Sequence, residues 1–180
     1  ITLADGTGLA ANYSISAGQT ITAHISPKSL TVSGNTASNK TYDSNSSATV
    51  TVTLSGFVGS ETLTYTNSSS FNNKNVGTGK TVTVDSITLA DGNNGGLASN
   101  YSVTPGQTTT ANITAKSLTV SGIIASSKTY DGSASATLDT SSVLYSGIIS
   151  GDTFAGSYTG AFSNANVGTG KTVTITSSYS

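Results

Sequence analysis

An internal repeat constrains the fold of this chain more than any other feature. Residues 28–49, KSLTVSGNTASNKTYDSNSSAT, return 88 positions later at 116–137 as KSLTVSGIIASSKTYDGSASAT. Residues 1–25 return at 87–113, where one loop is two residues longer. Self-similarity at a fixed period indicates an array of small modules that follow one another along the chain.

The repeat divides the 180 residues into three parts. Residues 28–115 form one complete repeat, residues 1–27 match the C-terminal part of a preceding repeat, and residues 116–180 match the N-terminal part of a following one. Because the chain also lacks Met, we expect an excerpt of a longer array or a processed product. Residues 1–27 of one molecule are further expected to complete residues 116–180 of an identical neighbour, which gives an open head-to-tail filament.

Alternating apolar and polar residues predict six short strands in the complete repeat. Val, Ile and Thr are frequent in these segments, and β-branched residues favour strands. The apolar positions change face at Asp85-Ser86, which predicts a bulge there. No window has helical spacing over three turns, so few helices are expected. The expected strands are SLTVSG (29–34), SATVTVTL (47–54), ETLTYT (61–66), KTVTVDSITL (80–89), NYSVT (100–104) and TTTANIT (108–114).

A strand with a polar residue at every second position buries one face only. The sequence therefore predicts an all-β fold, with a small antiparallel β-sandwich in each repeat. A module of this size can bury roughly 60% of its unfolded surface, which suffices for a small core. The joins ISPKSL and ITAKSL are short and favour a rod. Immunoglobulin-like and β-grasp-variant topologies both remain open.

The charge of the chain argues against nucleic acid and anionic membranes as partners, and its composition favours a location outside the cell. Charged residues make up 8% of the chain, and the net charge is −1. This balance offers no electrostatic footprint for nucleic acid or an anionic membrane. No segment reaches the roughly 20 apolar residues of a membrane-spanning helix. Because Cys, Met, Trp and Arg are all absent, we expect a secreted protein at the bacterial cell surface.

The motif NVGTGKTVTV at 75–84 ends like a phosphate-binding loop, and it returns at 166–175 as NVGTGKTVTI. A phosphate-binding loop needs a first glycine five positions before its Gly-Lys-Thr and a helix after it. Lys74 and Ala165 occupy that glycine position, and both motifs continue as alternating strand residues. We therefore expect a hairpin turn at each copy, not a nucleotide site.

No catalytic, cofactor-binding or metal-binding residue is predicted. The single His24 aligns with Asn112 of the next copy, and Glu61 is the only Glu, so neither a histidine-based site nor a pair of catalytic carboxylates recurs with the repeat. The aspartates precede turns, where a carboxylate usually accepts a hydrogen bond from the backbone two residues on. A non-enzymatic protein is therefore expected. The turn aspartates are Asp5, Asp43, Asp91 and Asp131.

Lysine and asparagine residues in matched motifs suggest isopeptide cross-links as a further alternative. Surface stalks without cysteine can be cross-linked by isopeptide bonds between Lys and Asn, and the matched residues are Lys40, Lys128, Asn12 and Asn100. An exposed lysine and a turn asparagine are the favoured interpretation. Loss of ammonia from the intact mass would distinguish the two.

Several segments resemble a known family when they are taken together. KTYDG (128–132), LASNYSV (97–103), ITAKSLTVSG (113–122) and NVGTGKTVTV, in this order and spacing, resemble YDG-type repeats, which are related to MBG repeats. Such repeats occur in filamentous-haemagglutinin-like and other large bacterial adhesins. The resemblance covers essentially the whole chain. The first copy departs from the family motif, since it has YDS at 42–44.

The resemblance implies a tandem, all-β extracellular module in the stalk of an adhesin, a filament or a biofilm matrix protein. The expected function is then mechanical: spacing, cohesion and adhesion, with neighbouring repeats as partners. The alternative is a carbohydrate-binding module that holds surface glycans through loops at Tyr42, Tyr101 and Tyr130. Exposed, coplanar tyrosines would favour glycan binding, whereas buried tyrosines would favour the stalk.

Overall fold

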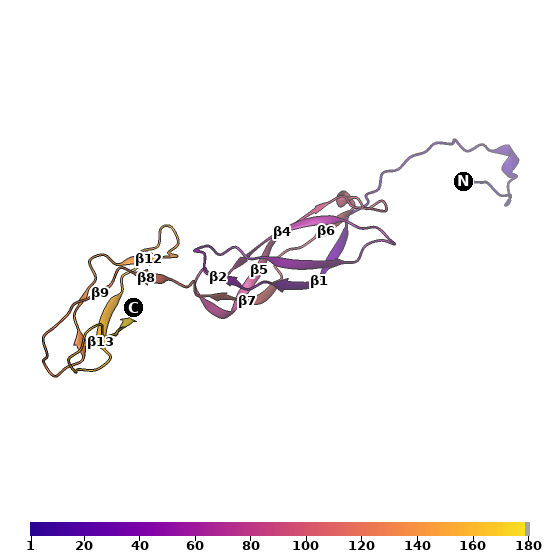
Figure 1. Ribbon diagram of the computed structural model, residues 1–180. Helices are drawn as coiled ribbons and strands as arrows, with labels where there is room; N and C mark the ends of the chain where they lie inside the picture. Colours follow the sequence, from indigo (N-terminus) through magenta and orange to yellow (C-terminus); the bar gives the residue numbers. More distant parts are fainter. Residues whose placement is uncertain (179–180) are drawn as a thin grey trace.

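A computed structural model describes residues 1–178, and this range contains β-strands and two short 3-10 turns but no α-helix (Figure 1). The expectation of an all-β chain with few helices is therefore confirmed. The elements of the first part are η1 (Ala10–Asn12), β1 (Lys28–Ala37), β2 (Lys40–Thr41), β3 (Val50–Ser55), β4 (Thr64–Phe71), β5 (Gly77–Ala90), η2 (Ala98–Asn100), β6 (Tyr101–Val103) and β7 (Thr108–Thr114). The elements that follow are β8 (Thr119–Ser121), β9 (Ile124–Ala125), β10 (Ser135–Ala136), β11 (Leu138–Asp139), β12 (Leu144–Ser146), β13 (Ser157–Phe162) and β14 (Val173–Ser178).

Two sheets make up the complete repeat. The first has the strand order β3-β1-β6, and the second has the order β2-β7-β5-β4. The sequence predicted antiparallel strands, and this is wrong for two pairs, because β1 runs parallel to β6 and β2 runs parallel to β7. Parallel neighbours need a crossover, which the intervening strands supply. Since alternation has the same period in both kinds of pair, the sequence pattern cannot distinguish them.

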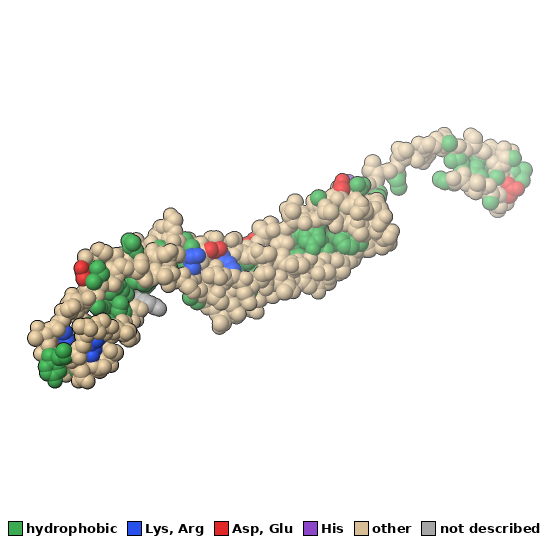
Figure 2. All heavy atoms as spheres, viewed as in Figure 1, with side chains coloured by type: hydrophobic (Ala, Val, Ile, Leu, Met, Phe, Trp, Pro, Cys, Tyr) green, Lys and Arg blue, Asp and Glu red, His purple; other side chains and the backbone are tan. Residues whose placement is uncertain are grey.

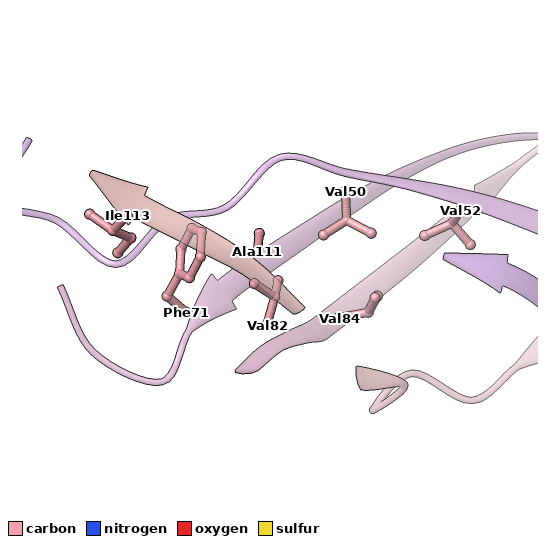
Figure 3. Packing of buried hydrophobic residues seen from close by; sticks show 7 residues of the cluster. All are labelled: Val50, Val52, Phe71, Val82, Val84, Ala111 and Ile113. Carbon is pink, nitrogen blue, oxygen red and sulfur yellow. The ribbon is translucent and has the colours of Figure 1, made fainter. Parts of the chain in front are cut away.

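The hydrophobic core lies between these two sheets (Figure 3). Val82 and Val84 of β5 are completely buried, and Ile113 of β7 is 1% exposed. Full burial of one such aliphatic side chain contributes roughly 1.5–3 kcal/mol. The core thus holds β5 and β7 together across the second sheet and against β3. Its buried members are Val50, Val52, Phe71, Val82, Val84, Ala111 and Ile113.

The predicted bulge in β5 is present at Asp85. Ser86 of β5 pairs with Ser68 of β4, but the next pair joins Val84 to Ser69, so Asp85 has no paired partner in β4. The extra residue reverses which positions face inward. Val84 faces the core before the bulge, and Ile87 packs against the core after it.

The strands β8–β14 repeat part of this arrangement with smaller sheets. β8 pairs with β12, β9 pairs with β11, and β13 lies between β10 and β14. No residue between 116 and 178 is buried. The apolar positions of this second unit therefore lack the cover that their counterparts have in the complete repeat.

Residues 1–27 extend away from the sheets and form only the short turn η1 (Figure 1). Hydrophobic side chains are exposed along this segment (Figure 2), and Ile21 is 96% exposed. None of the described residues forms a helix long and apolar enough to cross a membrane.

Candidate functional site

The YDS and YDG turns have the same local construction. In the first, Lys40 Nζ lies 2.7 Å from Asp43 Oδ1, which also accepts a hydrogen bond from the Asn45 amide. In the second, Lys128 Nζ lies 2.8 Å from Asp131 Oδ1, which accepts from the Ser133 amide. The expected bond to the backbone two residues on is therefore confirmed at Asp43 and Asp131.

The lysine in each of these turns lowers the pKa of the neighbouring carboxyl group. The hydrogen bond from Lys128 is the largest cause for Asp131, whose pKa falls to about 2, and the Ser133 amide lowers it further. The pKa of Asp43 is lowered in the same way, first by Lys40. Each lysine ammonium also lies over a phenylalanine ring, Lys40 over Phe71 and Lys128 over Phe162. In each unit the lysine therefore links the turn to a phenylalanine of a neighbouring strand, Phe71 of β4 or Phe162 of β13.

The other two turn aspartates behave differently from the expectation. Asp5 Oδ1 accepts from the amide of Ala10, and Asp91 Oδ1 accepts from the amide of Ala98. Each bond spans more than two residues and reaches the start of η1 or η2. The two-residue pattern is wrong here because the loop after each aspartate closes onto a 3-10 turn.

The first copy of NVGTGK completes the expected turn between two antiparallel strands, but its residues from Gly77 onward already belong to the second strand. β4 ends at Phe71 and β5 begins at Gly77. Asn73 Oδ1 accepts hydrogen bonds from the Asn75 amide and from Lys80 Nζ, at 3.0 and 2.7 Å. The lysine that would bind phosphate in a nucleotide loop thus lies in β5, and its ammonium group is hydrogen-bonded back to the turn.

The second copy of this turn repeats the same contacts. Asn164 Oδ1 accepts from the Asn166 amide and from Lys171 Nζ. Gly170 has a left-handed φ of 62°, close to the 58° of Gly79. Both copies thus form the same loop.

The three tyrosines proposed for glycan binding lie in different surroundings. Tyr101 is 6% exposed, and its hydroxyl donates to Glu61 Oε2 at 2.5 Å and accepts from the Val58 amide. Its pKa is raised, chiefly by the hydrogen bond to Glu61. Tyr42 is half-buried, whereas Tyr130 is 65% exposed. The tyrosines therefore do not present one common exposed surface.

Tyr42 forms a contact between the complete repeat and the unit that follows it. Its hydroxyl donates a 3.0 Å hydrogen bond to Asp152 Oδ2. A cavity of about 650 Å³ lies beside this bond and is lined from both sides of the join. Its apolar lining includes Val76, Leu118, Ile149 and Phe154.

Sequence reasoning missed Asp152, although a signal was present. Counted from the two NVGTGK motifs, Asp152 occupies the position of Glu61, and both acids follow a matched turn. The amide of Glu61 donates to Val58 O, and the amide of Asp152 donates to Ile149 O. The same turn thus presents an acid to a tyrosine hydroxyl in both units, within the repeat at Glu61 and across the join at Asp152.

A larger groove opens in the C-terminal unit. It has a volume of about 700 Å³ and lies between residues 125–130 and the second NVGTGK loop. Its lining includes Phe162, Val167 and Val173, of which Val167 is 88% exposed. In the complete repeat, the corresponding space between β2 and β5 is occupied by β7.

The lysines and asparagines proposed for isopeptide bonds are not brought together in matching pairs. Lys40 Nζ contacts Asn45, whereas Asn100 ends η2 next to β6. Lys128 contacts Asp131 and Ser133, and Asn12 lies in the exposed segment before β1. Within residues 1–178, no three His, Asp or Glu side chains are grouped so that they could hold a metal ion.

The comparisons with known proteins agree with this repeated construction. No curated protein and no solved structure matches the chain. A family model described as the YDG domain matches residues 26–111 and residues 114–180, which is well over half of the chain. The chain therefore belongs to the YDG domain family.

Proposed function

We propose that this chain is a structural stalk repeat of a secreted bacterial surface adhesin or extracellular filament. In this role it provides spacing, cohesion and adhesion, and its partners are neighbouring repeats. The proposed location is the bacterial cell surface, which the low charge and the absence of Cys, Met, Trp and Arg support. The tandem units are proposed to form a rod without enzymatic activity.

The contact between Tyr42 and Asp152 carries this proposal. A stalk transmits force and keeps distance only if each unit is held against the next. β7 ends at Thr114 and β8 begins at Thr119, so the join is short. The bond from Tyr42 spans this join, and apolar residues such as Val76 and Leu118 lie beside it. A short join with a hydrogen bond across it restricts motion between units.

A distance measurement between spin labels tests the proposal. Because the chain has no native Cys, labels can be placed on Thr88→Cys in the complete repeat and Thr159→Cys in the next unit, both of which are exposed. We expect one narrow distance distribution by pulsed electron spin resonance. The matched control places both labels in the complete repeat, at Thr51→Cys and Thr88→Cys. A distribution across the join much broader than in the control would contradict a stalk.

Glycan binding remains the alternative, and the exposure of Tyr130 favours testing it. Saturable binding on a glycan array that is lost in Tyr130→Ala would support a carbohydrate-binding module. The stalk proposal expects no such binding, because Tyr130 occupies the position at which Tyr42 meets the next unit.

A further inference from the structure

The first segment of the complete repeat pairs with its last segment at both ends of the fold. β1 is parallel to β6, and β2 is parallel to β7. Partners in both pairs are 73 positions apart, so residues 28–41 and 101–114 keep one register although each segment crosses from one sheet to the other. The paired residues are Lys28 and Tyr101, Ser29 and Ser102, Leu30 and Val103, Lys40 and Ile113, and Thr41 and Thr114.

Side chains and one further backbone bond strengthen the pairing of β2 with β7. Asn39 Oδ1 accepts a 2.7 Å hydrogen bond from the Asn112 amide. Thr114 Oγ1 donates to the Lys40 carbonyl oxygen at 3.3 Å, and the Tyr42 amide donates to the Thr114 carbonyl oxygen at 2.8 Å. The two segments are therefore joined over a longer stretch here than the two residues of β2 alone provide.

Tyr101 strengthens the pairing of β1 with β6, which has only three residues. Its hydroxyl donates to Glu61 and accepts from the Val58 amide, and its ring meets the Phe57 ring edge-on at 5.7 Å between centroids. Leu30, which belongs to the same strand pair, is 6% exposed, as is Tyr101. The short strand β6 is thus fixed to the body of the repeat by a buried side chain.

The two parallel pairs lie where tension along the chain acts on the repeat. The chain enters the complete repeat beside β6 and leaves it beside β2, at the opposite end (Figure 1). Tension therefore pulls the first segment toward one end and the last segment toward the other. Because hydrogen bonds between strands run across the strands, this load strains the bonds of a pair together and not one after another.

We propose that the pairs β1/β6 and β2/β7 form a shear clamp that keeps the complete repeat folded under tension. The inference rests on the proposed stalk function and deepens it, because it names the strands that bear the load. Every bond of the clamp joins two residues of the complete repeat. The parts of the chain on either side are needed only to transmit the force.

Force spectroscopy of the full chain tests the clamp. Because the chain has no native Cys, handles can be attached at Pro27→Cys and Ala115→Cys, which are exposed and bracket the complete repeat. Opening of the clamp should release residues 28–114 in one step, with a contour length of roughly 300 Å. Handles at Thr64→Cys and Ala90→Cys, which face each other at the open end of the antiparallel β4/β5 pair, load its bonds one at a time. The repeat should open at a lower force in this second geometry, and equal forces in the two geometries would overturn the proposal.

Removal of one clamp bond separates the clamp from overall stability. Asn39→Ala removes the acceptor of the Asn112 amide, and it should shorten the lifetime of the folded repeat under constant force at least about fivefold, the effect of one hydrogen bond. Asn73→Ala is the matched control, because Asn73 accepts its two bonds within the β4/β5 hairpin, which stays closed while the clamp opens. The control should lower the equilibrium stability and leave the lifetime under force unchanged. Equal shortening in both variants would refute the clamp.

Thr114→Val gives a second test that does not depend on the folding of Asn39→Ala. It removes only the hydroxyl that donates to Lys40, and it should also shorten the lifetime under force. If neither variant shortens the lifetime while the distance distribution across the join stays narrow, the clamp is wrong and the proposed stalk function stands. If the clamp variants behave as expected but that distribution is broad, the stalk function alone is contradicted.

Discussion

Tyr42 Oη donates a hydrogen bond to Asp152 Oδ2 across 110 residues of sequence, and this bond joins two successive units of the chain. Tyr42 belongs to the motif that the family is known by, so the first residue of that motif has a role outside its own repeat. Asp43, the next residue, acts within the repeat through Lys40. The motif thus combines a contact to the neighbouring unit with the closure of a local turn.

Replacement of Asp152 should lower the pKa of Tyr42. The hydrogen bond to Asp152 is the largest cause that raises this pKa above its ordinary value of 10.0. A folded-state pKa above the unfolded value stabilises the fold at lower pH, and this stabilisation is lost as pH rises through the folded pKa. We therefore expect the join to loosen above pH 10, and Asp152→Asn to bring the Tyr42 titration back toward 10.0. NMR of the Tyr42 ring resonances over an alkaline pH series measures both effects.

Asp139→Asn is the control for this titration, since Asp139 accepts from the Ser141 amide in its own turn. It should leave the Tyr42 titration unchanged. An unaltered Tyr42 pKa in Asp152→Asn would show that the contact across the join does not form in solution.

Truncation of Ile113 should destabilise the complete repeat far more than truncation of its counterpart Ile25. Ile113 is 1% exposed in the core, and loss of a buried Ile side chain typically costs 2–5 kcal/mol, so about 3 kcal/mol is expected for Ile113→Ala. Ile25 is 101% exposed, and Ile25→Ala should leave the free energy of unfolding of the dilute chain nearly unchanged. Denaturant unfolding at low concentration measures both. Similar losses in the two variants would mean that residues 1–27 are packed in solution.

The local structure of the complete repeat could be predicted from sequence because it depends on short-range patterns. Alternation in 80–89 and 108–114 located two central strands, and the change of face at Asp85 located the bulge. Gly and Asn in NVGTGK indicated the hairpin turn, although the turn ends before Gly77, where β5 begins. Each of these features depends on residues that are adjacent in the chain, where side-chain periodicity and turn chemistry act directly.

The pairing of distant strands could not be predicted in the same way. A strand such as β1 has the same alternation of apolar and polar residues beside a parallel and beside an antiparallel neighbour. Its parallel pairing with β6 therefore could not be recognised from the sequence. The contact of Tyr42 with Asp152 depends on how two units meet, which no local pattern specifies. The sequence signal for Asp152 was its position, because it stands in the second copy where Glu61 stands in the first.

Removal of Lys128 should raise the pKa of Asp131. The hydrogen bond from Lys128 is the largest cause that lowers this pKa to about 2. A depressed folded-state pKa stabilises the fold above the unfolded value of 3.8, and this stabilisation is lost as pH falls through about 2. In Lys128→Ala the Asp131 pKa should move toward 3.8, although the Ser133 amide keeps part of the shift. Carboxyl NMR titration measures the change, and Lys116→Ala, which removes an exposed lysine elsewhere in the same unit, should not alter it.

Exchange of Ser44 and Gly132 between the two YDG-motif turns should move stability in opposite directions. Both residues have left-handed backbones, with φ of 63° at Ser44 and 78° at Gly132. The left-handed conformation is unfavourable by roughly 1–2 kcal/mol for a residue with a Cβ, whereas glycine adopts this conformation readily. Since glycine also loses more chain entropy on folding, Ser44→Gly should stabilise the complete repeat by about 0.5–1 kcal/mol.

Gly132→Ser should destabilise the C-terminal unit by a similar amount, because a Cβ at Gly132 would meet no atom within 4 Å and the cost is conformational alone. Urea unfolding, followed by NMR signals from each unit separately, measures the two changes. Gly132→Ala is the control for the serine hydroxyl, and it should lower the free energy of unfolding of the C-terminal unit as much as Gly132→Ser does. If Ser44→Gly were destabilising instead, the Ser44 side chain would have to contribute a contact that outweighs its backbone strain.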